Sequence, residues 1–201
     1  MIKVVVFDLG GVLFSEGKSV AIDTLSRKHG YPRELLQKLL SSPESIKLRK
    51  GLMSDESFWS WVQKQLPEGC DAALVKKEWY DGYVLDEDIR ALVKELKGKY
   101  KLIVFSGNVQ SRVQFLEKKY GFRHLFDVEI YSFDYHCTKP DKQFVEIMIE
   151  KAGCKPEEIL YIEDNEGYAK PALELGAQVL IYTRGEAATL RSNLREQGVL
   201  L

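Results

Sequence analysis

Residues 3–13 have the sequence KVVVFDLGGVL, and this stretch decides the fold that we expect. The run at 3–8 is short, continuous and rich in β-branched and aromatic residues, which is typical of a strand buried on both faces of a parallel sheet. The strand ends at Asp8, and the paired glycines Gly10 and Gly11 predict a tight turn directly after it. The chain therefore opens with a buried strand that delivers a carboxylate to a glycine turn.

Four further runs of the same character follow, separated by patterns with helical spacing. They predict strands at residues 101–106, 127–132, 158–163 and 178–183, with helices at 109–120, 141–152, 167–175 and 186–197. Strands that alternate with helices in this way imply βαβ units and a mostly parallel sheet. We therefore predict a doubly wound α/β core.

The interval 15–85 breaks this alternation, because it contains no convincing strand. Its patterns predict helices at about 19–29, 33–41, 55–65 and 71–83, and a helix at 86–97 leads back into the core. We expect an α/β core made of residues 1–14 and 86–201, with an α-helical cap of residues 15–85 inserted after the first strand.

Composition limits the classes of partner. The 201 residues have a formal net charge of −1 and no polybasic arm, so no nucleic-acid partner is expected. The apolar N-terminus is too short to cross a bilayer and lacks the features of a signal peptide, so no membrane partner is expected. Cys70, Cys137 and Cys154 lie far apart without a C-x-x-C pair, which argues against a disulfide framework or a zinc site. We expect a cytoplasmic protein; the sequence does not indicate its oligomeric state.

Polar residues follow the ends of the predicted strands. Asp8 ends the first strand, Ser106 the second, and Glu163 and Asp164 the fourth, while Lys139 lies in the loop after the third. Ligands of open parallel sheets bind outside the carboxyl ends of the strands. These carboxylates, the hydroxyl and the ammonium group are therefore expected in one cleft.

These residues belong to four motifs that resemble, in the same order, those of the haloacid dehalogenase superfamily. The motifs are DLGGV at 8–12, SGN at 106–108, KPD at 139–141 and YIEDN at 161–165. The helical segment after the first motif is similar to the helical version of the family's cap. The resemblance implies a hydrolase that cleaves a small phosphate monoester, such as a sugar phosphate, through an aspartyl-phosphate intermediate.

The resemblance also implies a magnesium site beside the nucleophile. Asp8 would be the nucleophile, and Mg²⁺ would hold this carboxylate and the anionic phosphate together. Its ligands would be Asp8, Asp164 and the backbone carbonyl of Gly10, with Glu163 in support. Such a site uses oxygen donors alone, as Mg²⁺ prefers.

A second group of motif residues would bind the phosphoryl group. Lys139 would neutralise the nucleophile and the transferring group. The Ser106 hydroxyl and the amides of Gly107 and Asn108 would donate hydrogen bonds to phosphoryl oxygens. The partner implied is a small phosphorylated metabolite.

Gly10 departs from the phosphatase pattern. Family phosphatases usually carry at this position a second Asp, which protonates the leaving group and then activates water. Such acid–base catalysis contributes about two to four orders of magnitude in rate. His136, three residues before Lys139, is a candidate substitute, although an ordinary loop residue is the simpler interpretation.

Gly10 also keeps two alternatives open. One is a metal-independent 2-haloacid dehalogenase, since those enzymes also lack the second Asp, although their first motif typically continues with Tyr-Gly-Thr. The other is a catalytically weak binding or regulatory protein that kept the fold.

The predicted cap has no motif that identifies specificity residues. Trp59, Trp61 and Trp79 could line a pocket beneath it. Such aromatic residues more often form the core of a small helical module, so we expect that role.

Overall fold

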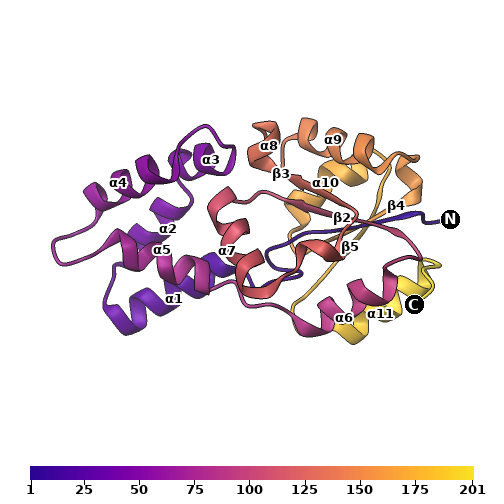
Figure 1. The fold of residues 1–201 in the computed structure, drawn as a ribbon, viewed down its shortest axis with the longest axis horizontal. Coiled ribbons are helices and arrows are strands. Elements are labelled where there is room, and N and C mark those ends of the chain that lie inside the picture. Colours follow the sequence, from indigo (N-terminus) through magenta and orange to yellow (C-terminus); the bar gives the residue numbers. More distant parts are fainter.

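One five-stranded sheet organises the computed structural model, which describes residues 1–201 (Figure 1). The strands run in the order β3-β2-β1-β4-β5, and every neighbouring pair is parallel. Their bounds are β1 Val4–Phe7, β2 Lys101–Ser106, β3 Val128–Tyr131, β4 Ile159–Glu163 and β5 Gln178–Ile181. Each strand lies inside the range predicted from the sequence, and all five end at the same edge of the sheet.

The central strand is β1, because both of its edges are paired. Phe7 lies opposite Val104 of β2 and Ile162 of β4. Alternate residues of β1 point to opposite faces, as the pleat of a strand requires. Val5 and Phe7 belong to the larger of two hydrophobic cores, and Val4 and Val6 belong to the smaller one.

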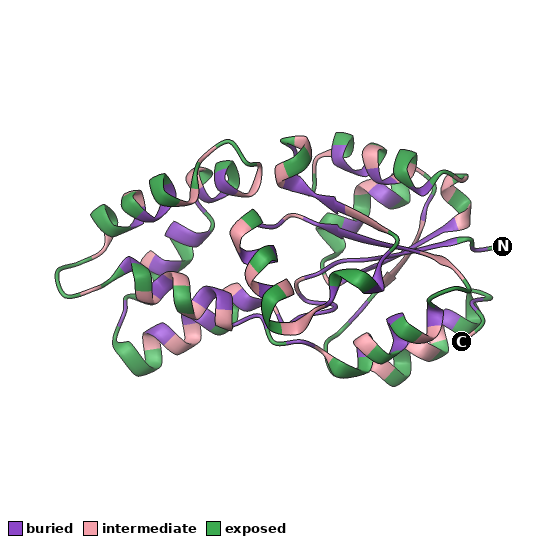
Figure 2. Cartoon of the chain, in the orientation of Figure 1, coloured by how far each residue is buried: buried purple, intermediate pink, exposed green.

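Helices cover both faces of this sheet, so the three inner strands β2, β1 and β4 are buried, whereas the edge strands β3 and β5 are partly exposed (Figure 2). Helices α9 and α10 pack on the smaller core, and α6, α7 and α11 pack on the larger one. The bounds are α6 Glu87–Leu96, α7 Gln110–Tyr120, α8 Ser132–Tyr135, α9 Lys142–Ala152, α10 Glu166–Glu174 and α11 Ala187–Glu196, with 3₁₀ turns η1 Arg123–Leu125 and η2 Pro156–Glu158. The predicted doubly wound α/β fold is confirmed.

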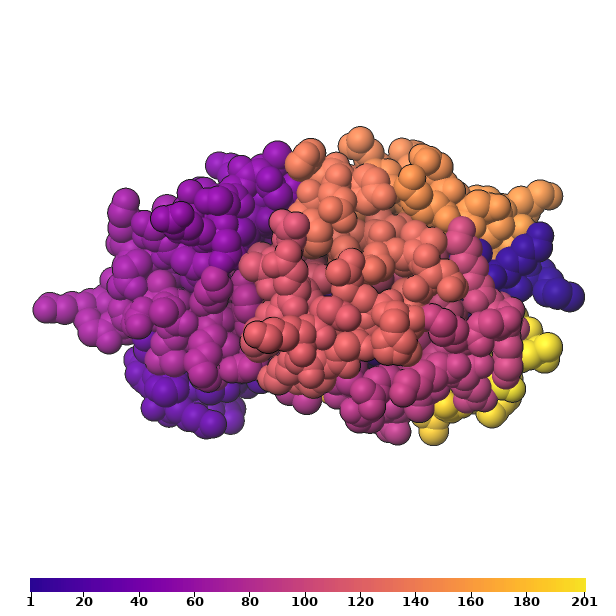
Figure 3. Space-filling view, viewed as in Figure 1, coloured from indigo at the N-terminus to yellow at the C-terminus, as the bar shows by residue number.

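Five more helices lie between β1 and α6, and we call α1–α5 the helical insert. Their bounds are α1 Gly17–His29, α2 Arg33–Leu40, α3 Pro43–Arg49, α4 Asp55–Gln65 and α5 Ala72–Asp81. The insert lies beyond the carboxyl ends of the strands (Figure 1), and in Figure 3 it abuts the part of the core that contains α7 and α8. The exact division into a core and a cap at residues 15 and 85 stays a prediction.

The sequence prediction missed the two short helices α3 and α8. Helix α3 has clear local signals, since Ser42 caps it by accepting a hydrogen bond from the Ser45 amide and Pro43 occupies its first turn. Its seven residues are too few for a recognisable apolar period. No helix in the structure is long and apolar enough to cross a membrane.

The tryptophans of the insert lie in its core, as expected. Trp79 is fully buried and Trp59 is 9% exposed, and their rings meet edge to face with centroids 6.0 Å apart. Phe58 packs against both rings, while Trp61 is half-buried at the margin. None of the three tryptophans lines the pocket described below.

Two chain crossings join the insert to the core. The outgoing residue Phe14 forms an antiparallel bridge with the returning residue Leu85. Beside it, the Ser15 amide donates to the Val84 carbonyl at 2.9 Å, and the Ser15 hydroxyl donates to the Gly82 carbonyl at 2.6 Å. The paired crossings hold the insert over the carboxyl edge of the sheet.

Candidate active site

Asp8 lies at the carboxyl end of the central strand and is only 6% exposed. Its amide donates to the Ile162 carbonyl at 3.0 Å, which continues the pairing of β1 with β4. The turn that follows contains Gly11 at φ +97°, where a Cβ atom would lie 2.0 Å from Oδ2 of Asp164. Glycine is therefore required at residue 11 by its φ and by the close approach of the second carboxylate.

Lys139 joins two of the acidic residues. Its Nζ donates to Oδ1 of Asp8 at 2.6 Å and to Oε2 of Glu163 at 2.7 Å. Burial lowers the pKa of Lys139, but the charges of Asp8 and Glu163 outweigh that effect and hold the pKa above its ordinary value. The rings of Phe105 and Tyr161 lie 5.0 and 5.3 Å from the ammonium group and add cation–π contacts. Lys139 is thus a charged, immobilised group.

Glu163 is fully buried, and both of its carboxylate oxygens are engaged. Oε2 accepts from Lys139 and from the Tyr161 hydroxyl, and Oε1 accepts from the amides of Asp164 and Asn165, both at 3.2 Å. Burial raises the pKa of Glu163, but the Lys139 charge and these hydrogen bonds bring it below its ordinary value. Glu163 therefore orients Lys139 and the turn after β4.

Three carboxylates converge around this single lysine. One oxygen from each of Asp8, Glu163 and Asp164 lies within 4.8 Å of the other two. Burial and the charge of Glu163 raise the pKa of Asp8 to about 7, against the opposing effect of Lys139. Burial, a hydrogen bond with Glu163 and the charge of Asp8 raise the pKa of Asp164 to about 8. The cluster is short of positive charge, and its oxygen donors suit a hard divalent cation such as Mg²⁺.

The second motif lies beside Asp8 at the end of β2. Ser106 is 3% exposed, and its Oγ accepts from Nδ2 of Asn108 at 3.5 Å. A Cβ atom at Gly107 would lie 2.5 Å from Oγ1 of Thr138, so the third-motif loop can approach closely only because residue 107 is glycine. The Asn108 amide donates to Ser132 Oγ at 3.0 Å, so this amide is engaged within the protein.

Arg112 orients the Asn108 side chain, a contact that the sequence analysis missed. Its Nε donates to Oδ1 of Asn108 at 2.8 Å. Arg112 is 1% exposed and lies 4.5 Å from the ring centroids of both Trp79 and Tyr83. The only available signal was the i,i+4 spacing from Asn108 into the following helix, which does not identify a site residue.

Tyr83 occupies the space beside Gly10, and the sequence analysis missed it too. A Cβ atom at Gly10 would lie 3.0 Å from Cε1 of Tyr83 and 3.5 Å from its hydroxyl oxygen. Tyr83 lines the pocket at 7% exposure, and burial raises its pKa despite the nearby charge of Arg112. An aromatic side chain from the end of the insert thus fills the position where family phosphatases carry their second Asp.

His136 does not line the pocket. It is exposed, and its ring Nδ1 lies 2.8 Å from the Lys50 carbonyl oxygen. The geometry therefore gives no support to His136 as the substitute acid–base group, and the simpler interpretation as a loop residue holds.

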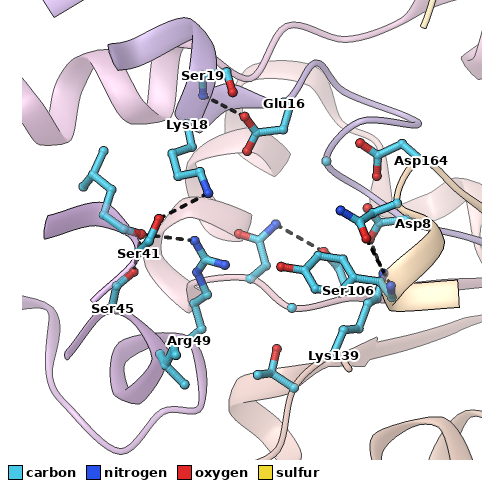
Figure 4. A pocket seen from close by; sticks show the side chains of 18 of the residues that line it. Asp8, Glu16, Lys18, Ser19, Ser41, Ser45, Arg49, Ser106, Lys139 and Asp164 are labelled. Atoms are coloured by element: carbon cyan, nitrogen blue, oxygen red, sulfur yellow. Dashed lines mark hydrogen bonds and ion pairs between the residues drawn. The ribbon is translucent and has the colours of Figure 1, made fainter. Parts of the chain in front are cut away.

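The acidic cluster forms one side of a pocket of about 510 Å³ between the sheet and the insert (Figure 4). We call Asp8, Ser106, Lys139 and Asp164 the core wall. The insert wall lies opposite and consists of Lys18, Gln37, Ser41, Ser45 and Arg49. Only 4 of the 21 lining residues are hydrophobic, so the pocket suits a small polar ligand.

Comparison with known proteins agrees with this architecture. Residues 2–176 match a family model described as haloacid dehalogenase-like hydrolase. An uncharacterised protein of Dictyostelium discoideum is 39% identical over 91% of this chain and 92% of its own length. An uncharacterised hydrolase of Schizosaccharomyces pombe is 22% identical over 82% of each chain.

Two solved structures share the fold. A HAD-family enzyme of Bacteroides thetaiotaomicron in complex with magnesium and inorganic phosphate superposes with a TM-score of 0.78, at 23% identity, over 92% of this chain and 96% of that one. The L-2-haloacid dehalogenase of Xanthobacter autotrophicus with covalently bound chloropropionic acid has a TM-score of 0.68, at 24% identity, over 100% and 85%. At these identities the likeness concerns the fold alone.

Proposed function

The chain belongs to the haloacid dehalogenase-like hydrolases, and we propose from this premise that it is a Mg²⁺-dependent phosphatase of a small phosphate monoester. The observation that carries the proposal is the buried cluster of Asp8, Glu163 and Asp164 around Lys139, which has too little positive charge for its carboxylates. The Bacteroides structure, crystallised with magnesium and phosphate on the same fold, supports it.

Asp8 is the proposed nucleophile. One of its carboxylate oxygens attacks phosphorus, the ester P–O bond breaks, and the alcohol leaves with a proton taken from water. The aspartyl phosphate that forms is then cleaved by water to inorganic phosphate and free Asp8. Lys139, held against Asp8 by Glu163, favours the ionised form of the nucleophile and offsets the charge of the phosphoryl group.

The proposed metal ligands are Asp8, Asp164 and the Gly10 carbonyl, with Glu163 in support. When bound, Mg²⁺ would bring the two anions together and stabilise the charge that develops on the phosphoryl oxygens. The raised pKa values of Asp8 and Asp164 support this set, because burial and the repulsion between carboxylates raise them and a bound cation would offset both effects.

Ser106, Gly107, Asn108 and Lys139 are the proposed phosphoryl-binding residues. The Ser106 hydroxyl and the Gly107 amide are assigned as donors to phosphoryl oxygens. For Asn108 we assign the side chain, because its backbone amide already donates to Ser132. Arg112 acts through Asn108 as a positioning residue.

A dehalogenase remains the second candidate, because of the surroundings of Gly10. Haloacid dehalogenases carry Tyr in the position of the second Asp, and here the Tyr83 ring lies against Gly10. The shared fold with the Xanthobacter enzyme is compatible with this candidate. The acidic cluster favours the phosphatase, since a metal-independent reaction has no use for a further partly buried carboxylate at Asp164.

The test is hydrolysis of p-nitrophenyl phosphate by the purified protein with Mg²⁺ or with EDTA, beside Asp8→Asn. We expect turnover that EDTA abolishes and that Asp8→Asn lowers about a thousandfold or more. Halide release from 2-chloropropionate in EDTA, without phosphatase turnover, would support the dehalogenase. Binding of phosphate without either reaction would support a catalytically weak binding protein.

A further inference from the structure

The insert wall presents two cations to the pocket. Lys18 lies in the first turn of α1, and its Nζ has one hydrogen-bond partner, Oγ of Ser41 at 3.5 Å. Arg49 ends α3; its Nη2 donates to the Leu40 carbonyl at 3.5 Å, and its Nε is buried without a partner. In Figure 4 both side chains lie opposite Asp8, Asp164 and Lys139, across the pocket.

Neither cation is paired with a carboxylate, although the chain forms ion pairs elsewhere. No carboxylate oxygen lies within 4.0 Å of the charged atoms of Lys18 or Arg49. Glu16 is the one carboxylate that lines this side, and its Oε2 accepts from the Ser19 amide at 2.7 Å as the cap of α1. The two cations therefore stay available to a ligand.

A third unpaired cation lies behind them. Arg112 is fully buried, its Nη1 has no partner, and it stacks on the Trp79 ring near which Arg49 also lies, 5.8 Å from the ring centroid. The charge of Arg49 adds to burial in lowering the pKa of Arg112, so the two guanidinium groups repel each other. Glu16, which caps α1, is the one carboxylate on this side of the pocket, so the cations here outnumber the anions, whereas buried charges are normally paired.

We propose that Lys18 and Arg49 bind a second anionic group of the substrate, a carboxylate, at the end of the molecule opposite its phosphate. This inference rests on the proposed phosphatase function for the phosphate end. A guanidinium fork and an ammonium group suit the two oxygens of a carboxylate. The substrate class is thus a phosphorylated hydroxy acid rather than a neutral sugar phosphate.

Binding to the Asp8→Asn protein tests this inference independently of turnover. Titration calorimetry with Mg²⁺ would compare two pairs of ligands that differ mainly by a carboxylate: 3-phosphoglycerate with glycerol 3-phosphate, and 6-phosphogluconate with sorbitol 6-phosphate. The two pairs cover two carbon-chain lengths. We expect the carboxylated member to bind at least about tenfold more tightly in one or both pairs, as charge-assisted hydrogen bonds predict.

Substitution of Lys18 and Arg49 tests whether these two residues cause the tighter binding of the carboxylated ligands. In the Asp8→Asn background, Arg49→Met and Lys18→Met each reduce the preference, and the double variant binds both members of a pair equally. Lys38→Met is the matched control, because Lys38 is an exposed residue of α2 outside the pocket, and it keeps the full preference.

Equal affinity within both pairs, or a preference that survives in the double variant, overturns the inference. These results are separable from a failure of the proposed function. Turnover of p-nitrophenyl phosphate without a carboxylate preference removes the inference and keeps the phosphatase. A carboxylate preference in a protein that hydrolyses no phosphate ester keeps the anion site and removes the phosphatase.

Discussion

The core wall and the insert wall of the same pocket carry their charges in opposite ways. On the core wall, Lys139 contacts Asp8 and Glu163 at 2.6 and 2.7 Å, so its ammonium group is held before any ligand arrives. On the insert wall, Lys18 and Arg49 have no carboxylate partner. The core wall thus has a preformed network of ion pairs, whereas the insert wall has cations that, in our proposal, the ligand pairs.

The largest loss of stability should come from removing Lys139, the paired cation of the core wall. Lys139→Met leaves Asp8 and Glu163 buried without their counterion, so we expect about 3–5 kcal/mol less free energy of unfolding, together with loss of phosphatase turnover. Urea denaturation without Mg²⁺ measures the first effect. Lys142→Met, at an exposed lysine three residues along, should leave stability unchanged. A loss below about 1 kcal/mol for Lys139→Met would contradict the role of the core ion pairs.

Two left-handed glycines allow a matched comparison of the same regions. Gly11 of the core turn and Gly30 of the insert have φ values of +97° and +71°. A Cβ atom at Gly30 meets nothing within 4 Å, whereas one at Gly11 would overlap Asp164. We expect Gly30→Ala to lower the free energy of unfolding by about 1 kcal/mol. Gly11→Ala should lower it by about 3 kcal/mol and abolish the stabilisation of the fold by Mg²⁺. Equal losses in thermal and urea unfolding would show that the carboxylate contact has no energetic weight.

Mg²⁺ should stabilise the folded protein through the core wall, and more at high pH. Because the folded-state pKa values of Asp8 and Asp164 are raised from the ordinary 3.8 to about 7 and about 8, the metal-free fold loses stability as pH rises from the ordinary value to the raised ones. Mg²⁺ needs the deprotonated carboxylates. At a Mg²⁺ concentration a hundredfold above the Kd at pH 9 we expect a Tm increase of about 5–10 °C near pH 9, and a smaller one at the same concentration near pH 6.

Differential scanning fluorimetry with and without Mg²⁺ measures this shift. Asp164→Asn should remove most of it, while Asp134→Asn, outside the pocket, should keep it. A shift that is larger at the lower pH, or that survives in Asp164→Asn, would place the metal elsewhere.

The smallest change in stability is expected from substitutions in the insert wall. Arg49→Met and Lys18→Met break no ion pair, so each should change the free energy of unfolding by less than about 0.5–1 kcal/mol. The same urea experiment as for Lys139→Met makes the comparison direct. A loss as large as that of Lys139→Met would mean that these cations support the fold instead of awaiting a ligand.

Much of the core could be predicted because its signals are local. Asp8, Ser106 and Glu163 stand at the end of an apolar run, so a strand and the polar group at its end are recognised together. Three features of the site could not be predicted in this way: Tyr83 beside Gly10, Arg112 behind Asn108, and the cations of the insert wall. The contact of Tyr83 and the cations of the insert wall depend on how the insert packs against the sheet, whereas Arg112 contacts Asn108 at an i,i+4 spacing that many helix residues share.

The sequence by itself determined the parallel α/β sheet, the helical nature of the insert and the convergence of Asp8, Lys139, Glu163 and Asp164. It could do so because parallel strands bring all their carboxyl ends to one edge. Only the tertiary structure decided that Tyr83 fills the space beside Gly10 and that Lys18 and Arg49 face the acidic cluster. Those contacts join residues far apart in the chain, and their geometry follows from the packing of the insert against the core, which no local pattern encodes.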